Sequence, residues 1–192
     1  PESMAQYVRG PQAFRLASNP AAESRAWMAA GIAGGISPWW HHVSAGLDDL
    51  RQHGNVKPLM DWHRANDRFL YDRHPVANVA LLWSHENIEF YGRDRAKERD
   101  LLPLRGFIRA LARARIPYHV AHPDQLDRLG PDLSAVILPD LAAVTDSHLD
   151  ALRAFAARGG SIVATGRSAT LDAFGDPRPE YPLADLLGLR PT

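Results

Sequence analysis

Four consecutive residues, Trp39, Trp40, His41 and His42, could form a carbohydrate subsite. Indole rings stack on the apolar faces of sugars, and imidazoles donate hydrogen bonds to hydroxyl groups. The alternative interpretation is that both tryptophans pack in a core or at a domain interface, where large aromatic side chains are usually found. The residue types alone leave both interpretations open.

A second candidate site combines His85 and Glu86 with Asp140. Each of these residues closely follows a predicted strand, and sites in parallel sheets lie at the carboxyl ends of the strands. The same rule directs attention to residues 122–124 and 166–168. The segment after the first of these strands is polar and aromatic, which suits a sugar or a protein surface better than a phosphate. An ordinary exposed loop is the alternative interpretation.

Several enzyme mechanisms are excluded or disfavoured. The sequence has no cysteine, which excludes disulfides, thiolate metal sites and a cysteine nucleophile. Ser168 lacks the Gly-x-Ser-x-Gly environment of a nucleophile elbow, so a helix-capping or turn hydroxyl is its favoured role. Neither a Gly-x-Gly-x-x-Gly motif nor a P-loop is present. No cofactor is therefore expected.

The nine histidines are scattered along the chain. No His-x-x-x-His or His-Glu-x-x-His spacing places two ligands on one face of a helix. On local spacing, the sequence predicts no metal site.

Net charge and hydropathy limit the classes of partner that this chain could bind. The 22 basic and 22 acidic residues balance to zero net charge, which provides no basic field for nucleic acid or an anionic membrane surface. No apolar run is long enough to span a bilayer. We expect a cytoplasmic location, with neither nucleic acid nor membrane as a partner. The start at Pro1 rather than Met indicates an excerpt of a longer protein.

From residue 75 onward the sequence predicts a parallel α/β domain, because near-continuous apolar runs suit strands that are covered on both faces. Four strands are expected, at residues 76–83, 116–121, 135–138 and 161–165. Helices are expected around residues 104–111, from 145–147 to Gly159-Gly160, and at 183–189. Strands that alternate with helices at this spacing imply right-handed crossovers.

The first part of the chain predicts a smaller unit. A helix with Pro20 at its start is expected to end near Gly34-Gly35. The apolar residues 36–40 then predict a short strand, and a second helix is expected around residues 57–70. One such αβα unit cannot cover both faces of its strand, so it requires neighbours outside this sequence.

The α/β order resembles that of flavodoxin-like and class I glutamine amidotransferase-like domains. In an amidotransferase the turn corresponding to residues 164–168 would carry the nucleophile, and Gly166 stands at about that position here. An amidotransferase or hydrolase acting on its own is therefore disfavoured.

Three segments carry a more specific resemblance: residues 73–84 (RHPVANVALLWS), 140–147 (DLAAVTDS) and 158–166 (RGGSIVATG). They resemble the trimerisation domain of family 42 β-galactosidases. Upstream, residues 14–20 (FRLASNP) and 30–40 (AGIAGGISPWW) look like the closing αβα unit of the (β/α)8 barrel in such enzymes. The resemblance implies two domains, a barrel fragment with a linker helix at 1–74 and an amidotransferase-like domain at 75–192.

The resemblance also implies a function. It indicates a noncatalytic structural and oligomerisation domain of a glycoside hydrolase, trimeric by likeness, whose parent binds the carbohydrate. The two catalytic carboxylates of such enzymes would lie upstream, so the chain alone is expected to be inactive. The Trp/His group would then stand at the mouth of the barrel. The alternative is a free-standing module of flavodoxin-like fold that binds a small ligand or a carbohydrate.

Overall fold

The computed structural model describes residues 3–4, 6–9, 12–18, 20–41, 51–73 and 76–189, with backbone alone over residues 3–18, 41 and 51–52. Its contacts divide the chain into two units, Pro1–Pro75 and Val76–Thr192.

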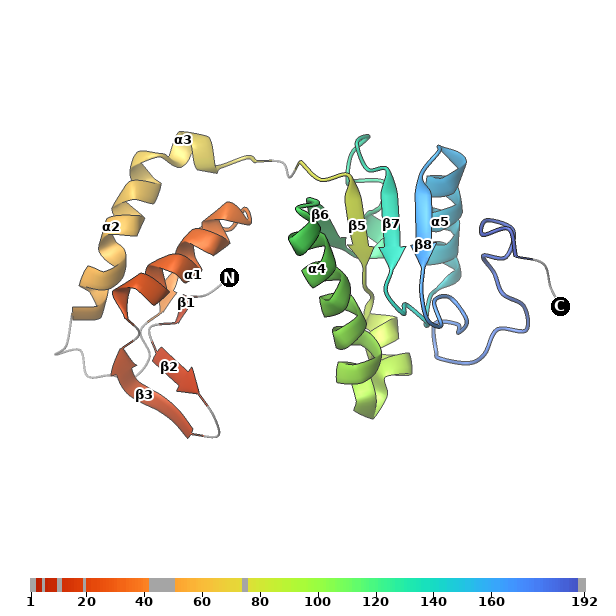
Figure 1. Ribbon diagram of the computed structural model, residues 1–192, viewed down its shortest axis with the longest axis horizontal. Helices are drawn as coiled ribbons and strands as arrows, with labels where there is room; N and C mark the ends of the chain where they lie inside the picture. The colour runs from red at the N-terminus through yellow and green to blue at the C-terminus, as the bar shows by residue number, and fades with distance from the viewer. Residues whose placement is uncertain are drawn as a thin grey trace. The chain divides into compact units, whose positions relative to one another are not determined.

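The second unit is built on one parallel sheet of four strands in the order β6-β5-β7-β8 (Figure 1). The strands are β5 (Val79–Leu82), β6 (Tyr118–Ala121), β7 (Ala135–Leu138) and β8 (Ser161–Ala164). In the central strand, Val79 pairs with Tyr118 on one side and with Ala135 on the other. This sheet confirms the predicted α/β class, and its parallel pairing is consistent with a flavodoxin-like domain.

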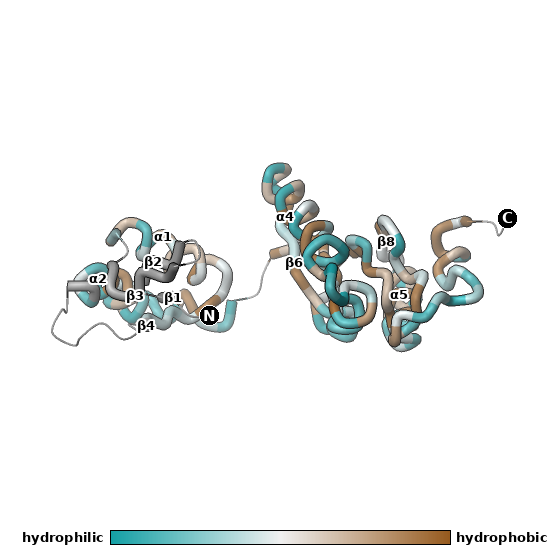
Figure 2. The backbone as a smooth tube through the Cα atoms, turned by 90° about the horizontal axis from the view of Figure 1, so that it is seen from below, coloured by the Kyte–Doolittle hydropathy of each residue, from teal (hydrophilic) through white to brown (hydrophobic). Residues whose placement is uncertain are grey.

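Successive side chains of a strand point to opposite faces of the sheet. Both faces of this sheet carry apolar side chains, and each face is covered by one helix. Helix α5 (Asp146–Ala157) packs Leu152 and Phe155 against the face that carries Leu82. Helix α4 (Leu102–Ala114) packs on the other face, which carries Leu81 and Ile137. In Figure 2 the colour along α4 alternates between hydrophilic and hydrophobic, as expected for a helix with one buried face.

The segment after β5 differs from the predicted loop. It forms helical turns that lead directly into α4. These are π-helix η1 (Asn87–Gly92), 3-10 helix η2 (Arg93–Arg95) and π-helix η3 (Lys97–Leu101). The buried Asn87 side chain donates to the Asp100 carboxylate at 2.7 Å, which ties the two π-helices together. A contact between residues 13 positions apart, such as Asn87 and Asp100, cannot be predicted from local sequence patterns.

The expected helix at residues 183–189 is wrong, since these residues form a run of turns. The segment is too short to be a stable helix by itself. Gly188 has a left-handed φ of 65°, and Leu183 is fully buried in the core beside α5. Packing of Leu183, Leu186 and Leu187 against this core, rather than helical periodicity, accounts for the apolar character of the segment.

The first unit contains a helix that was predicted and a hairpin that was not. Helix α1 (Ala21–Ala33) follows Pro20 and ends before Gly35, whose φ is 89°, as expected from the sequence. The unpredicted hairpin pairs β2 (Gln6–Arg9) with β3 (Gln12–Ser18) in antiparallel fashion.

The other elements of the first unit are shifted from their predicted bounds. The expected strand at 36–40 is reduced to β4 (Trp40–His41), which pairs in parallel with β1 (Ser3–Met4). The expected helix at 57–70 is longer and interrupted, with α2 (Arg51–Ala65) followed by α3 (Asp67–Leu70). These helices and α1 border an apolar cavity of about 440 Å³ that includes Ile32 and Trp62 in its lining.

Among the described residues, no helix has the length and apolar character required to cross a membrane.

Candidate functional site

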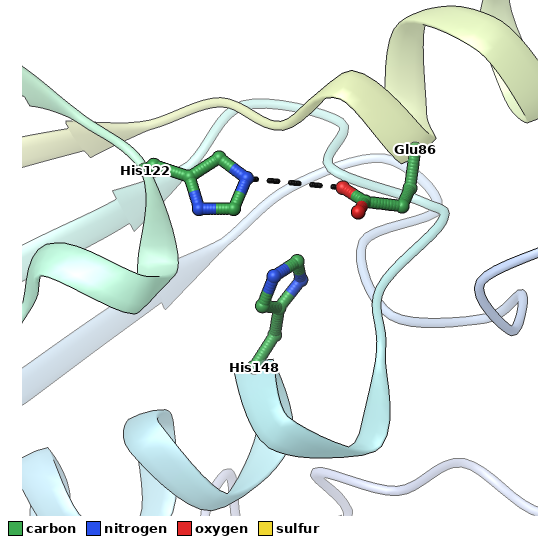
Figure 3. A group of neighbouring side chains, drawn as sticks. All are labelled: Glu86, His122 and His148. Atoms are coloured by element: carbon green, nitrogen blue, oxygen red, sulfur yellow. Dashed lines mark ion pairs between the residues drawn. The ribbon is translucent and has the colours of Figure 1, made fainter.

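Three side chains converge at the carboxyl edge of the parallel sheet, as Figure 3 shows. Glu86 belongs to the helical turn after β5, His122 directly follows β6, and His148 lies in the first turn of α5, after β7. Because β6, β5 and β7 are neighbours in the sheet, their ends meet at one place. One potential ligand atom from each side chain lies within 4.8 Å of the other two.

The cluster combines two imidazoles with carboxylates. Glu86 Oε2 lies 3.8 Å from His122 Nε2. Asp124 adds a second carboxylate, with Oδ1 at 3.4 Å from His148 Nε2 and Oδ2 at 3.4 Å from His122 Nδ1. The His148 side chain is only 2% exposed, whereas Glu86 retains 27% exposure. The cluster is therefore buried at one end and open to solvent at the other.

Local backbone structure positions both histidines. His148 is the third residue of α5, where its Nδ1 accepts from the Thr145 N–H at 3.3 Å and its own N–H donates to Thr145 Oγ1 at 3.1 Å. This reciprocal arrangement is a capping box with histidine in place of the usual Glu or Gln. His122 caps a short 3-10 helix, η4 (Pro123–Gln125), and its Nδ1 accepts from the Asp124 N–H at 3.4 Å. Both Nε2 atoms consequently face the carboxylates.

The electrostatic environment favours an ionised Glu86 beside a neutral His148. Burial opposes ionisation of Glu86, but hydrogen bonds from its own backbone N–H and from Ser84, together with His148 and His122, hold its pKa below 4.5. Burial lowers the pKa of His148 below 6.5, and the neighbouring Asp124 and Glu86 carboxylates only partly oppose this effect. With Nδ1 accepting from the Thr145 N–H, the neutral His148 ring carries its proton on Nε2, the atom that faces Asp124.

Of the second candidate site, only Glu86 joins this cluster. His85 is exposed and packs its ring edge-on against Trp83, with 4.9 Å between the centroids. The Asp140 carboxylate is engaged elsewhere, because Oδ1 accepts from the Arg167 N–H at 2.7 Å and Oδ2 accepts from the Tyr91 hydroxyl at 3.1 Å. Asp140 thus joins the ends of β7 and β8.

The turn after β8 has no room for a nucleophile at Gly166. Gly166 has a φ of 59°, and a Cβ atom there would lie 2.4 Å from Asp140 Oδ1. Ser168 is buried, and its Oγ lies 2.7 Å from the Thr165 carbonyl oxygen and accepts from the Leu141 N–H at 3.1 Å. As predicted, Ser168 is a structural turn hydroxyl.

The structure does not test the Trp/His subsite. Trp39 is 55% exposed, and the indole Nε1 of Trp40 is buried without a hydrogen-bond partner among the described residues. The side chain of His41 and the whole of His42 lie outside the described residues. A carbohydrate subsite formed by these four residues stays a prediction.

Sequence reasoning missed His148 and did not connect His122 with Glu86. Residues 122–124 were recognised as a strand end, but no ligand spacing linked them to other histidines. The available signal for His148 was its place at the third position after the Thr145 cap of a helix that follows a parallel strand. The strand order was needed to join these positions.

Comparison with known proteins gives matches for both sequence and fold. A family model described as the β-galactosidase trimerisation domain matches residues 77–191, more than half of the chain. No match to a curated protein was found.

Solved structures of β-galactosidases share the fold. Gan42B, a GH42 β-galactosidase from G. stearothermophilus, superposes with a TM-score of 0.78 at 17% identity, covering 95% of this chain and 29% of that one. The β-galactosidase from Bacillus circulans sp. alkalophilus gives 0.76 at 16% identity, with 96% and 30% coverage. That from Rahnella sp. R3 gives 0.69 at 19% identity, with 96% and 30% coverage. The chain thus spans about three tenths of these proteins.

Proposed function

The chain belongs to the β-galactosidase trimerisation domain family, and from this premise we propose that it is a noncatalytic, oligomerising part of a longer glycoside hydrolase. The parent would hydrolyse O-glycosidic bonds with two carboxylates located upstream of this chain. Residues 1–74 would be the end of its (β/α)8 barrel and a linker helix, and residues 75–192 would be the trimerisation-type domain. The parent, rather than this domain, would bind the carbohydrate.

The observation that carries this proposal is the filled turn after β8. An amidotransferase-like domain would need a nucleophile there, but this chain has Gly166, and the Asp140 carboxylate occupies the space of a side chain. The sheet therefore supports assembly and packing better than catalysis. We expect the 192-residue chain to show no turnover of a nitrophenyl galactoside, whereas measurable turnover would contradict the proposal.

The proposal of oligomerisation is supported by apolar surface on the sheet. Val120 on edge strand β6 and Val163 on edge strand β8 each remain 45% exposed. Leu81 pairs with Val120, and Ile137 pairs with Val163. Both valines therefore lie on the face of the sheet that α4 covers, beside Leu81 and Ile137. Helix α4 covers the centre of that face and leaves its margins open to another copy.

Light scattering of the 192-residue chain at micromolar concentration tests this association. We expect an assembly larger than a monomer, weakened by Val163→Asp because an ionised carboxylate is costly to bury in an interface. Val76→Asp is the matched control, since Val76 is 93% exposed and precedes β5. A monomer under all conditions, or equal weakening by both substitutions, would contradict the proposal.

The second candidate function, a free-standing module that binds a small ligand, is favoured by the cluster of Glu86, His122 and His148. A thermal-shift screen with a panel of sugars separates the two candidates, since only the binding module should be stabilised. The mass of the native protein in its source cells, detected with an antibody, gives an independent test. A mass well above that of 192 residues is expected for the hydrolase.

The cytoplasmic location stays a prediction.

A further inference from the structure

We propose that Glu86, His122 and His148 bind a divalent transition-metal ion, with Zn²⁺ as the preferred occupant. The proposal concerns only the second unit and does not depend on the function of a parent enzyme. Imidazole and carboxylate ligands suit zinc and its neighbours in the first transition series, whereas Mg²⁺ and Ca²⁺ prefer all-oxygen sites. Two imidazoles with one carboxylate and a solvent-accessible side match zinc sites with three protein ligands and one water.

The three ligand atoms need to move only slightly closer together to hold one zinc ion. The three ligand atoms lie within 4.8 Å of one another, while ligands around a tetrahedral zinc ion lie about 3.3 Å apart for bonds of about 2.0 Å. The three side chains come from different elements and point toward one shared volume (Figure 3). Side-chain rotations can bring them together without a change in the sheet.

An unsatisfied buried atom provides a second, independent observation. Glu86 Oε2 is buried and has no hydrogen-bond partner among the described residues. Buried polar atoms are nearly always paired with protein, water or an ion. This oxygen faces His122 Nε2 at 3.8 Å, a gap too long for a hydrogen bond. A metal ion between the two side chains would satisfy both.

Asp124 supplies an outer-shell partner. When zinc takes the Nε2 lone pair of His122, the ring proton must reside on Nδ1, and Asp124 Oδ2 lies 3.4 Å from that atom. A carboxylate that accepts from the second ring nitrogen is the common support of metal-bound histidine. Both rings would have to move their proton to Nδ1, so His122 would give up the 3.4 Å contact from the Asp124 N–H and His148 the 3.3 Å contact from the Thr145 N–H.

The competing account is a cluster bridged by water alone. A water could accept from both Nε2–H groups and donate to Glu86 Oε2, which would keep the histidine tautomers that the backbone contacts favour. This account predicts no zinc-dependent change in the cluster. The two accounts can therefore be separated experimentally.

Zinc titration of the 192-residue chain, stripped of metal by a chelator, tests the proposal. Competition with a chromophoric chelator should reveal one site with a Kd of about 1 µM or tighter. Glu86→Gln should weaken it at least tenfold, because glutamine keeps the shape but loses the charge. The matched control is Glu89→Gln, which changes an exposed carboxylate in π-helix η1, three residues after Glu86, and should leave the affinity unchanged. Asp124→Asn should weaken binding by about 10–100-fold, because the charged oxygen that supports the His122 Nδ1–H is replaced by a neutral amide.

Nitrogen-15 NMR of the imidazoles gives a readout that does not depend on affinity alone. Zinc should move the Nε2 resonances of His122 and His148 and leave those of other histidines in place. Unchanged resonances for these two rings, or equal affinity of the Glu86→Gln and control variants, would overturn the proposal. Thermal unfolding without metal checks that each variant is folded.

Discussion

The amide of Asn87 joins three segments of the second unit, and its removal tests the account of this region. The side chain is fully buried. Its Nδ2 donates to Asp100 Oδ1 at 2.7 Å, and its Oδ1 accepts from the Ala143 N–H at 3.1 Å. The bonds connect the turn after β5 with η3 and with the segment between β7 and α5.

Asn87→Ala should destabilise the second unit by about 3–5 kcal/mol. The substitution leaves the buried Asp100 carboxyl and the buried Ala143 N–H without their partner, and each unsatisfied group costs about 1–3 kcal/mol, with more for a charged one. Glu89→Ala, in the same π-helix but exposed, should change the stability by less than about 0.5 kcal/mol.

Urea unfolding of the 192-residue chain, followed through the NMR signals of the sheet residues Ala80 and Val136, measures the difference. With a urea dependence of about 1–3 kcal/mol per molar, the midpoint should fall by roughly 2 M in Asn87→Ala. If the two variants unfolded at the same midpoint, water would have replaced the amide, and the network would not stabilise this region.

Two further predictions concern packing and pH. Gly160→Ala should destabilise the second unit by about 1–3 kcal/mol in thermal unfolding, because the added Cβ would lie 2.2 Å from the buried Phe155 ring. The control is Gly106→Ala in α4, which should not destabilise the unit because the added Cβ would meet no atom within 4 Å. Burial, opposed by the Asn87 hydrogen bond and reinforced by the Asp140 charge, raises the pKa of Asp100 above 3.8. The unfolded chain then loses this proton first, so stability should fall as the pH rises above about 3.8 and stay lower at neutral pH. Asp100→Asn should flatten that part of the profile; an unchanged slope would refute the assignment.

Elements with strong local signals were predicted well. The bounds of β7 agree with the expected residues 135–138, because a short apolar run between turn residues allows few alternatives. Thr145 caps α5, and Gly159, with a φ of 93°, follows its end, as the capping pattern indicated. In these segments the local preferences of the backbone coincide with the tertiary contacts.

Segments whose structure depends on distant partners were predicted poorly. The turn after β5 is helical because Asn87 finds Asp100 and Ala143 as partners. Residues 183–189 look like a helix in sequence but form turns, because Leu183 is held in the core. Periodicity within a short window cannot report such contacts.

For the second unit, the sequence by itself determined which runs are strands and that the sheet is parallel, and for the whole chain it excluded cysteine chemistry, because apolar runs, alternation and residue types are local properties. Only the tertiary structure decided which strand ends are neighbours. The order β6-β5-β7 brings Glu86, His122 and His148 together, and the same packing directs the Asp140 carboxylate into the space at Gly166. Distances between side chains that are far apart in sequence follow from strand order and register, and neither is encoded in local spacing.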